Sequence, residues 1–133
     1  MSWSKDVAIR TVWMEARGEG QDGMRAVAHV LVNRLKDGRW GNTLAQVCQA
    51  SAQFSCWSTR DPNLHACNLQ PEDLPLFVQI GEWLDAALAG EEPDPTYGAT
   101  HYYATSMINP PYWTATAKLT VVINHHRFYK GVQ

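Results

Sequence analysis

The sequence is short of cysteine, of long apolar runs and of net charge, and each shortage excludes a class of protein. Its three cysteines, Cys48, Cys56 and Cys67, form an odd set without CxxC spacing, which indicates neither a disulfide framework nor a zinc site. We expect reduced, partly buried thiols, with a Cys56–Cys67 bridge after export as the alternative. No apolar run could span a bilayer. The formal net charge of -2 favours neither nucleic acid nor an anionic membrane surface as a partner.

Internal repeats, low-complexity tracts and linkers are also missing, so residues 1–133 are expected to form one domain. No HExxH or comparable ligand spacing is present. The adjacent His125 and His126 would point to opposite faces of a strand and could not chelate as a pair. We therefore expect neither a metal nor another cofactor, with His125 exposed and His126 acting through a hydrogen bond.

Glu15 stands within the apolar stripe of the first predicted helix, which the spacing of apolar residues places at 5–17 before Gly18. A carboxyl group there loses water without an obvious cation on the same face, so its pKa should rise. A carboxylic acid that is still protonated near neutral pH can protonate a leaving group. The alternative is that Glu15 reaches solvent or pairs with Arg10 or Arg17.

Glu19 is a second candidate acid. It follows the predicted helix end, in a turn that contains Gly18, Gly20 and Gly23, where backbone could approach a ligand closely. The alternative is a solvated loop acid of the kind that any short helix–helix turn can carry.

The remaining pattern is helical first and extended afterwards. Apolar periodicity and capping signals predict helices at 22–36, 44–49 and 71–89, while 51–70 shows no period and is expected to be a long loop. After Tyr97 the bias changes to β-branched and aromatic residues, which predicts a small antiparallel ribbon near the C-terminus. The fold class expected is therefore α+β, mainly helical.

Several blocks of the sequence resemble the SleB-type cell-wall hydrolases, also called the spore cortex-lytic enzyme family. The opening blocks are Glu15–Glu19, Ala26–Ala28 and Asn33–Arg34. The later blocks, in the same order as in the family, are Gln53–Ser55, Gly98–Tyr103, Trp113 and His126–Tyr129. The resemblance runs from about Asp6 to Tyr129, and the ordered set is far more specific than any one block.

The resemblance implies a lysozyme-like fold and cleavage of the β-1,4 link between N-acetylmuramic acid and N-acetylglucosamine in peptidoglycan. It assigns the general acid to Glu15, which matches the family's essential glutamate. Once ionised, Glu15 could take the proton of the sugar's own 6-hydroxyl and close an anhydro ring, as in a lytic transglycosylase. If Glu19 positions a water instead, the product is a reducing sugar and the enzyme is a muramidase. The sequence leaves these two outcomes open.

Substrate-binding residues are expected on two segments. In the loop, Gln53 and Ser55 would donate hydrogen bonds and Phe54 or Trp57 would stack on a pyranose ring. The alternative is that these two aromatic rings pack the loop onto the core.

In the C-terminal ribbon, Tyr102 or Tyr103, Trp113 and His126 would come together near the end of the first helix. Aromatic faces with polar tips suit sugars, because the C–H faces of the sugar stack and its hydroxyls need partners.

The first residues lack a secretory signal, so we expect the protein to be made in the host cytoplasm and released by another route. We also expect it to be a monomer. It would act on peptidoglycan in the periplasm or cell wall without a separate wall-binding module, as a phage or prophage endolysin does. Two other functions stay open. One is an amidase or peptidase that acts on the stem peptide, and the other is a non-catalytic saccharide-binding phage module.

Overall fold

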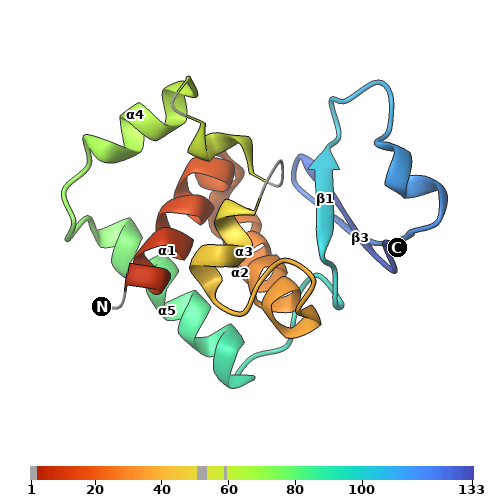
Figure 1. Ribbon diagram of the computed structural model, residues 1–133, viewed down its shortest axis with the longest axis horizontal. Coiled ribbons are helices and arrows are strands. Elements are labelled where there is room, and N and C mark those ends of the chain that lie inside the picture. Colours follow the sequence, from red (N-terminus) through yellow and green to blue (C-terminus); the bar gives the residue numbers. More distant parts are fainter. Residues whose placement is uncertain (1–2, 51–53, 59) are drawn as a thin grey trace.

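In the computed structural model, which describes residues 3–50, 54–58 and 60–133, five α-helices precede three short strands. The helices are α1 (Trp3–Ala16), α2 (Gly20–Asp37), α3 (Leu44–Gln49), α4 (Pro62–Asn68) and α5 (Pro75–Ala89). The strands are β1 (His101–Ala104), β2 (Lys118–Ile123) and β3 (His126–Lys130), and 3₁₀ turns lie at Arg17–Glu19, Ser55–Trp57 and Tyr112–Ala115. Figure 1 shows the helices gathered on one side and the sheet on the other. The expected α+β class is confirmed.

The predicted helices end where local chemistry stops them. Gly38 and Gly90 adopt the left-handed conformation, with φ of 88° and 68°, directly after α2 and α5. Thr43 caps α3 by accepting a hydrogen bond from the backbone N–H of Gln46. The segment from 51 to 70 departs from prediction, because it contains α4. This helix is only seven residues long and starts from the Asp61 cap and Pro62, so it carries no readable apolar period.

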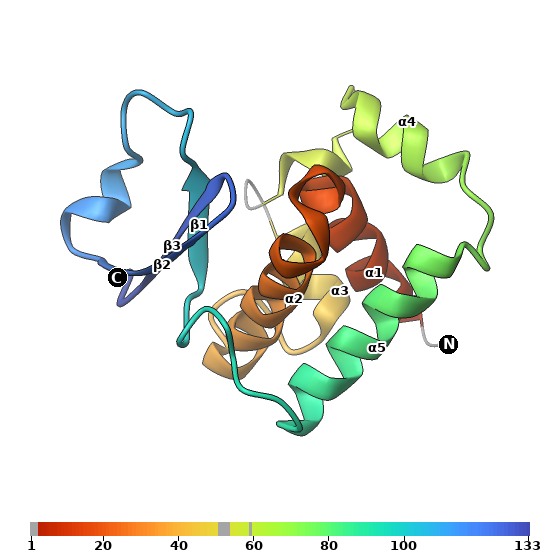
Figure 2. The same ribbon diagram turned by 180° about the vertical axis from the view of Figure 1, so that it is seen from behind.

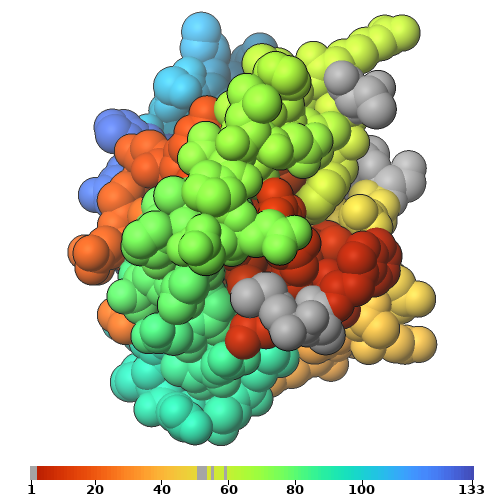
Figure 3. All heavy atoms as spheres, turned by 90° about the vertical axis from the view of Figure 1, so that its left-hand side faces the viewer, coloured from red at the N-terminus to blue at the C-terminus, as the bar shows by residue number. Residues whose placement is uncertain are grey.

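The main core lies around α1, which contacts α2, α3, α4 and α5. Ile9 and Val12 of α1, Leu31 of α2, and Ile80 and Leu84 of α5 are almost fully buried there. Figures 2 and 3 show α5 alongside α1, and α4 with the chain that leads into α5 crossing the outer face of the helices. The apolar stripe that holds Glu15 is therefore packed on several sides.

The strands form one antiparallel sheet in the order β1-β3-β2, so the last strand in the chain is the central one. On the face toward the helices, Phe128 of β3 packs with Ala26 and Val30 of α2 and with Ala99. This small second core fixes the sheet against α2.

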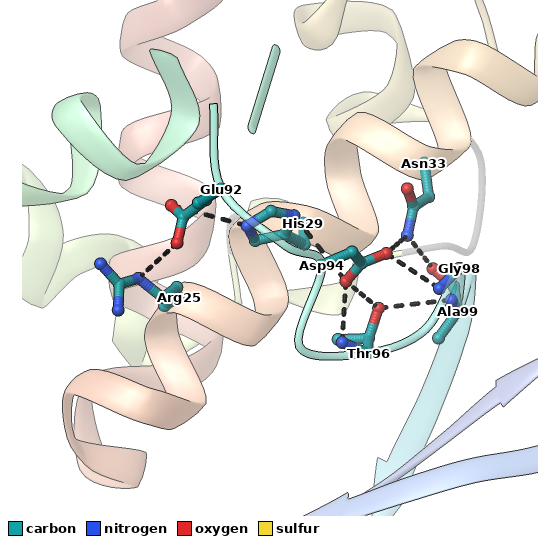
Figure 4. A network of polar contacts seen from close by, with 8 residues as sticks. All are labelled: Arg25, His29, Asn33, Glu92, Asp94, Thr96, Gly98 and Ala99. Atoms are coloured by element: carbon teal, nitrogen blue, oxygen red, sulfur yellow. Dashed lines mark hydrogen bonds and ion pairs between the residues drawn. The ribbon is translucent and has the colours of Figure 1, made fainter. Parts of the chain in front are cut away.

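The segment between α5 and β1 is held on α2 by a network around Asp94 (Figure 4). Its carboxylate accepts hydrogen bonds from Asn33 Nδ2, from both the backbone N–H and the hydroxyl of Thr96, and from the Gly98 N–H, at 2.7–2.9 Å. Burial raises the pKa of Asp94, but these hydrogen bonds outweigh it and hold the pKa below its usual value. Asn33 also donates to the carbonyl of Ala99, so the network sets where β1 begins.

The same network continues along α2 toward its N-terminus. The buried His29 lies between two carboxylates, with Nδ1 3.7 Å from Asp94 and Nε2 3.6 Å from Glu92, and Arg25 pairs with Glu92 at 3.2 Å. One face of α2 thus binds the segment between α5 and β1 by polar contacts, while the adjoining face binds the sheet by apolar contacts.

Candidate active site

Glu15 lies in the last turn of α1 with its carboxyl group part-buried. Burial raises its pKa, and hydrogen bonds from Tyr102 and Cys56 and the positive charge of Arg34 oppose that rise only in part. The rise in pKa that the apolar stripe predicts is confirmed. The Glu15 carboxyl group therefore keeps its proton to a higher pH than an ordinary glutamate does. When it ionises, the hydrogen bonds from Tyr102 and Cys56 stabilise the carboxylate.

Tyr102 reaches Glu15 from the sheet. Its Oη donates to Glu15 Oε1 at 2.7 Å, and its ring packs on His126 and Phe128, with centroids 4.8 and 5.6 Å apart. Burial and the neighbouring Glu15 raise the pKa of the Tyr102 phenol well above its usual value. The phenol is thus a fixed hydrogen-bond donor at any pH where the enzyme would work.

Glu19 lies in the 3₁₀ turn that joins α1 to α2, where its carboxylate is bound by the β2–β3 turn. Oε1 accepts the backbone N–H of His125 at 2.8 Å, and Oε2 lies 2.9 Å from His125 Nδ1. Asn124 Nδ2 donates to the Glu19 carbonyl at 2.5 Å. Burial would raise the pKa of Glu19, but the hydrogen bonds from His125 outweigh it and lower the pKa. Both carboxylate oxygens therefore serve to hold the hairpin on the helices.

A glycine at position 23 permits this contact. A Cβ at Gly23 would stand 2.4 Å from the Glu19 Cβ, so any larger residue would displace Glu19.

His126 lies behind Tyr102, with Nδ1 3.5 Å from Glu19 Oε1, which is too long for a good hydrogen bond. Burial lowers its pKa and keeps the ring neutral. His125 is 78% exposed at its side chain, as expected, yet it also contacts Glu19. Both histidines lie near one carboxylate because His125 belongs to the β2–β3 turn, where the alternation of a regular strand does not hold, and His126 is the first residue of β3.

A cavity of about 460 Å³ lies where the C-terminal end of α2 meets the sheet. Trp40 and Trp113 flank His101 there, with ring centroids 5.4 and 5.0 Å from the imidazole. Tyr102 is part of the same wall, so one side chain joins the cavity to Glu15. Trp40 and His101 were not among the predicted site residues, although His101 stands in the Gly98–Tyr103 block.

Of the predicted grouping, Tyr102 and His126 come together on the side of Glu15, whereas Tyr103 and Trp113 do not. Tyr103 and Trp113 lie together on the outer face of the sheet, 6.0 Å apart, while His126 lies on the inner face with Tyr102. Successive strand residues point to opposite faces, so only one of the two adjacent tyrosines can reach Glu15. The packing of Phe128 on α2 decides that it is Tyr102.

The loop residues are placed differently from one another. Phe54 is only 6% exposed and belongs to the main core, under the guanidinium of Arg34, so its ring is not open to a sugar in this structure. Trp57 donates from Nε1 to the Thr11 hydroxyl at 2.8 Å. Ser55 begins a 3₁₀ turn, and Gln53 lies outside the described residues.

The three cysteines are free and buried, so the alternative Cys56–Cys67 bridge is not formed. Burial raises the pKa of the Cys48 thiol to about 12 and also raises those of Cys56 and Cys67. Thiols that hold their protons so firmly are poor nucleophiles. Within residues 3–50, 54–58 and 60–133, no group of His, Cys, Asp and Glu side chains could hold a metal ion. No helix of that part of the chain has the length and apolar character to cross a bilayer.

Comparisons with known proteins support one family. A family model described as "Cell Wall Hydrolase" matches residues 18–129, a segment that includes Glu19 and begins just after Glu15. No curated protein matches the chain. Among solved structures, the catalytic domain of the germination-specific lytic transglycosylase SleB from Bacillus anthracis has the same fold, with a TM-score of 0.72 and 24% sequence identity. That match covers 98% of this chain and 97% of the other.

Proposed function

Since this chain belongs to the cell wall hydrolase family, we propose that it cleaves the glycan strands of peptidoglycan at the β-1,4 link between N-acetylmuramic acid and N-acetylglucosamine. The observation that carries the proposal is the Glu15 carboxyl group, whose pKa is raised by burial and which Tyr102 holds in place through a hydrogen bond of 2.7 Å. The fold shared with a domain described as a lytic transglycosylase supports the same reaction.

Glu15 acts as the general acid. Its proton passes to the glycosidic oxygen as the bond to the sugar breaks and positive charge develops at the anomeric carbon. The resulting carboxylate is stabilised by the hydrogen bond from Tyr102 and by the charge of Arg34. The hydrogen bonds from Tyr102 and Cys56 hold the carboxyl group in place for the proton transfer.

The second half of the reaction uses the same carboxylate. Glu15 takes the proton from the 6-hydroxyl of the sugar, and that oxygen attacks the anomeric carbon to close a 1,6-anhydro ring. Glu15 is thereby protonated again, and no water is consumed. Full engagement of the Glu19 oxygens by His125 favours this route over hydrolysis, because Glu19 is then not free to activate a water. Glu19 is proposed as a positioning residue.

The saccharide contact is proposed to come from Trp113 on the outer face of the sheet, where the buried Tyr103 packs against its ring and supports it. Tyr102 and His126 support Glu15 from the inner face. The loop residues Gln53 and Ser55 remain proposed hydrogen-bond donors to the glycan.

Mass spectrometry of digested sacculi tests the reaction. We expect new 1,6-anhydro-muramyl ends from the wild type and at least about 100-fold slower release by Glu15→Gln, which keeps the shape and loses the proton. Glu82→Gln, a substitution at an exposed position of α5, is the matched control and should digest normally. New reducing ends would instead indicate a muramidase, and new free amino groups an amidase or peptidase. Full activity of Glu15→Gln would exclude Glu15 as the acid.

A further inference from the structure

The cavity beside Tyr102 has the size of a ligand site and is not accounted for by acid catalysis at Glu15. At about 460 Å³ it falls within the usual range for small-molecule pockets. Its walls combine the Trp40 and Trp113 rings with the guanidinium groups of Arg34 and Arg39. Among the described side chains that line it, none is acidic.

Both guanidinium groups are held in fixed positions against one ring. Arg34 and Arg39 lie over Trp40, 4.8 and 4.4 Å from its centroid. Arg34 Nε donates to the Thr100 carbonyl at 2.5 Å, and Arg39 Nη1 donates to the Val132 carbonyl at 2.8 Å. Fixed donors lose little conformational entropy when a ligand binds, so the two charges are preorganised.

Arg39 keeps unused hydrogen-bonding capacity. Its Nε and Nη2 donate to the Asp37 carboxylate at 2.7 and 3.2 Å, and Nη1 donates to Val132. A guanidinium has five N–H groups, so two remain without a bond to any residue that the structure describes.

The pKa of His101 is sensitive to the positive charges of Arg34 and Arg39. After burial, the charges of Arg34 and Arg39 are the main causes that lower its pKa to about 4, against a weaker opposing effect of Asp37. The His101 imidazole in the cavity wall is therefore neutral at neutral pH. The same positive charges that disfavour its protonation would attract an anion into the cavity.

We propose that this cavity binds a carboxylate carried by the glycan strand next to the cleaved link. On the polymer that the proposed function assigns, such a carboxylate has two sources. One is the lactyl group of a muramyl residue without its peptide, and the other is the stem peptide of a substituted residue. The sugar or peptide that bears it packs on Trp40 and Trp113 while Arg39 contacts the carboxylate.

Calorimetric titration with three non-cleavable probes tests the site. The probes are the disaccharide N-acetylglucosaminyl-N-acetylmuramic acid, its neutral lactyl methylamide, and the disaccharide tetrapeptide. We expect the wild type to bind at least one acidic probe about tenfold more tightly than the methylamide, the usual effect of a charged hydrogen bond. Tight binding of the free disaccharide acid identifies the lactyl group, and tight binding of the tetrapeptide alone identifies the stem peptide.

Two pairs of variants locate the site without relying on one substitution. Tyr112 is 92% exposed and stands among the lining residues, so Tyr112→Glu and Tyr112→Gln should fold alike and differ by one charge. We expect the Glu variant to bind the acidic probe several-fold more weakly than the Gln variant, with equal binding of the methylamide. Arg39→Gln should weaken acidic binding about tenfold, and Arg39→Lys should retain part of it.

Equal binding of acidic and neutral probes, or equal binding by the two Tyr112 variants, would overturn the proposal, as would no binding of any probe. The result is separable from the proposed function. Wild-type protein that cuts glycan without preferring acidic probes refutes the cavity proposal alone. Wild-type protein that binds acidic probes but releases no glycan products refutes the cleavage alone.

Discussion

Tyr102 Oη donates a hydrogen bond to Glu15 Oε1 across 2.7 Å, joining two residues that stand 87 positions apart. The donor comes from the first strand and the acceptor from the last turn of the first helix. The protonation state of the proposed acid therefore depends on how the sheet docks on the helices.

Replacing Tyr102 by Phe removes this donor and keeps the ring. Because the hydrogen bond favours the ionised carboxylate, its loss should raise the pKa of Glu15 further and move the alkaline limb of the pH–rate profile to higher pH. We expect turnover at neutral pH to fall about tenfold, with little change in glycan affinity. Tyr103→Phe is the control, since that hydroxyl faces Tyr129 Oη at 3.4 Å and should leave the limb in place. An unmoved limb in Tyr102→Phe would show that the phenol does not act on Glu15.

Glu15→Gln should leave the protein at least as stable as the wild type at neutral pH. The pKa of Glu15 is raised in the folded state, so the folded protein holds more protons than the unfolded chain between the ordinary value of 4.5 and the raised one. Wild-type stability therefore falls as the pH rises through that window, and the Gln variant lacks this loss. Urea unfolding at several pH values should show the variant's advantage growing with pH and then becoming constant. A variant that is less stable at every pH would mean that the carboxyl group holds the fold together.

Glu19→Gln should destabilise the fold by about 1 kcal/mol at neutral pH, through a weaker contact with His125. The pKa of Glu19 is lowered in the folded state, so its contribution is present above the ordinary value of 4.5 and is lost as the pH falls through the folded value. Turnover should decrease, and the ratio of anhydro to reducing products should stay the same. A shift of that ratio toward reducing ends would show that Glu19 directs a water.

Phe54→Ala and Trp113→Ala should have opposite effects. Phe54 is in the core, so its loss should cost about 3–5 kcal/mol of stability and leave activity per folded molecule close to normal. Trp113 is partly exposed beside His101, so its loss should weaken glycan binding by about tenfold or more, with a smaller change in thermal midpoint. Calorimetry combined with binding to sacculi separates the two. A large stability loss in Trp113→Ala with unchanged binding would place that ring in the structural core.

The sequence predicted the long helices and the ribbon because their apolar spacing repeats over several turns or alternates along a strand. It did not predict α4, since seven residues with one buried cysteine carry no period. It also placed Glu15 in its apolar surroundings, because that depends only on neighbours along one helix.

What the sequence left open were contacts set by distant packing. Tyr102 and Tyr103 are equivalent in sequence until Phe128 fixes which face of the sheet meets α2. The hydrogen bonds between Glu19 and His125 depend on a turn that lies 106 positions further along the chain. Local patterns hold no information on either choice.

The sheet order β1-β3-β2 has a consequence for how the protein assembles. Both outer strands must wait for β3, the last of the three to be synthesised, because each pairs only with it and not with the other. Until β3 arrives, Tyr102 lacks the pairing with Phe128 that aims it at Glu15. Closing these distant contacts is slow compared with helix formation, so the helical part can form before the acid gains its partner. In a chain whose last strand has not yet been synthesised, Glu15 would lie among the helices without the hydrogen bond from Tyr102.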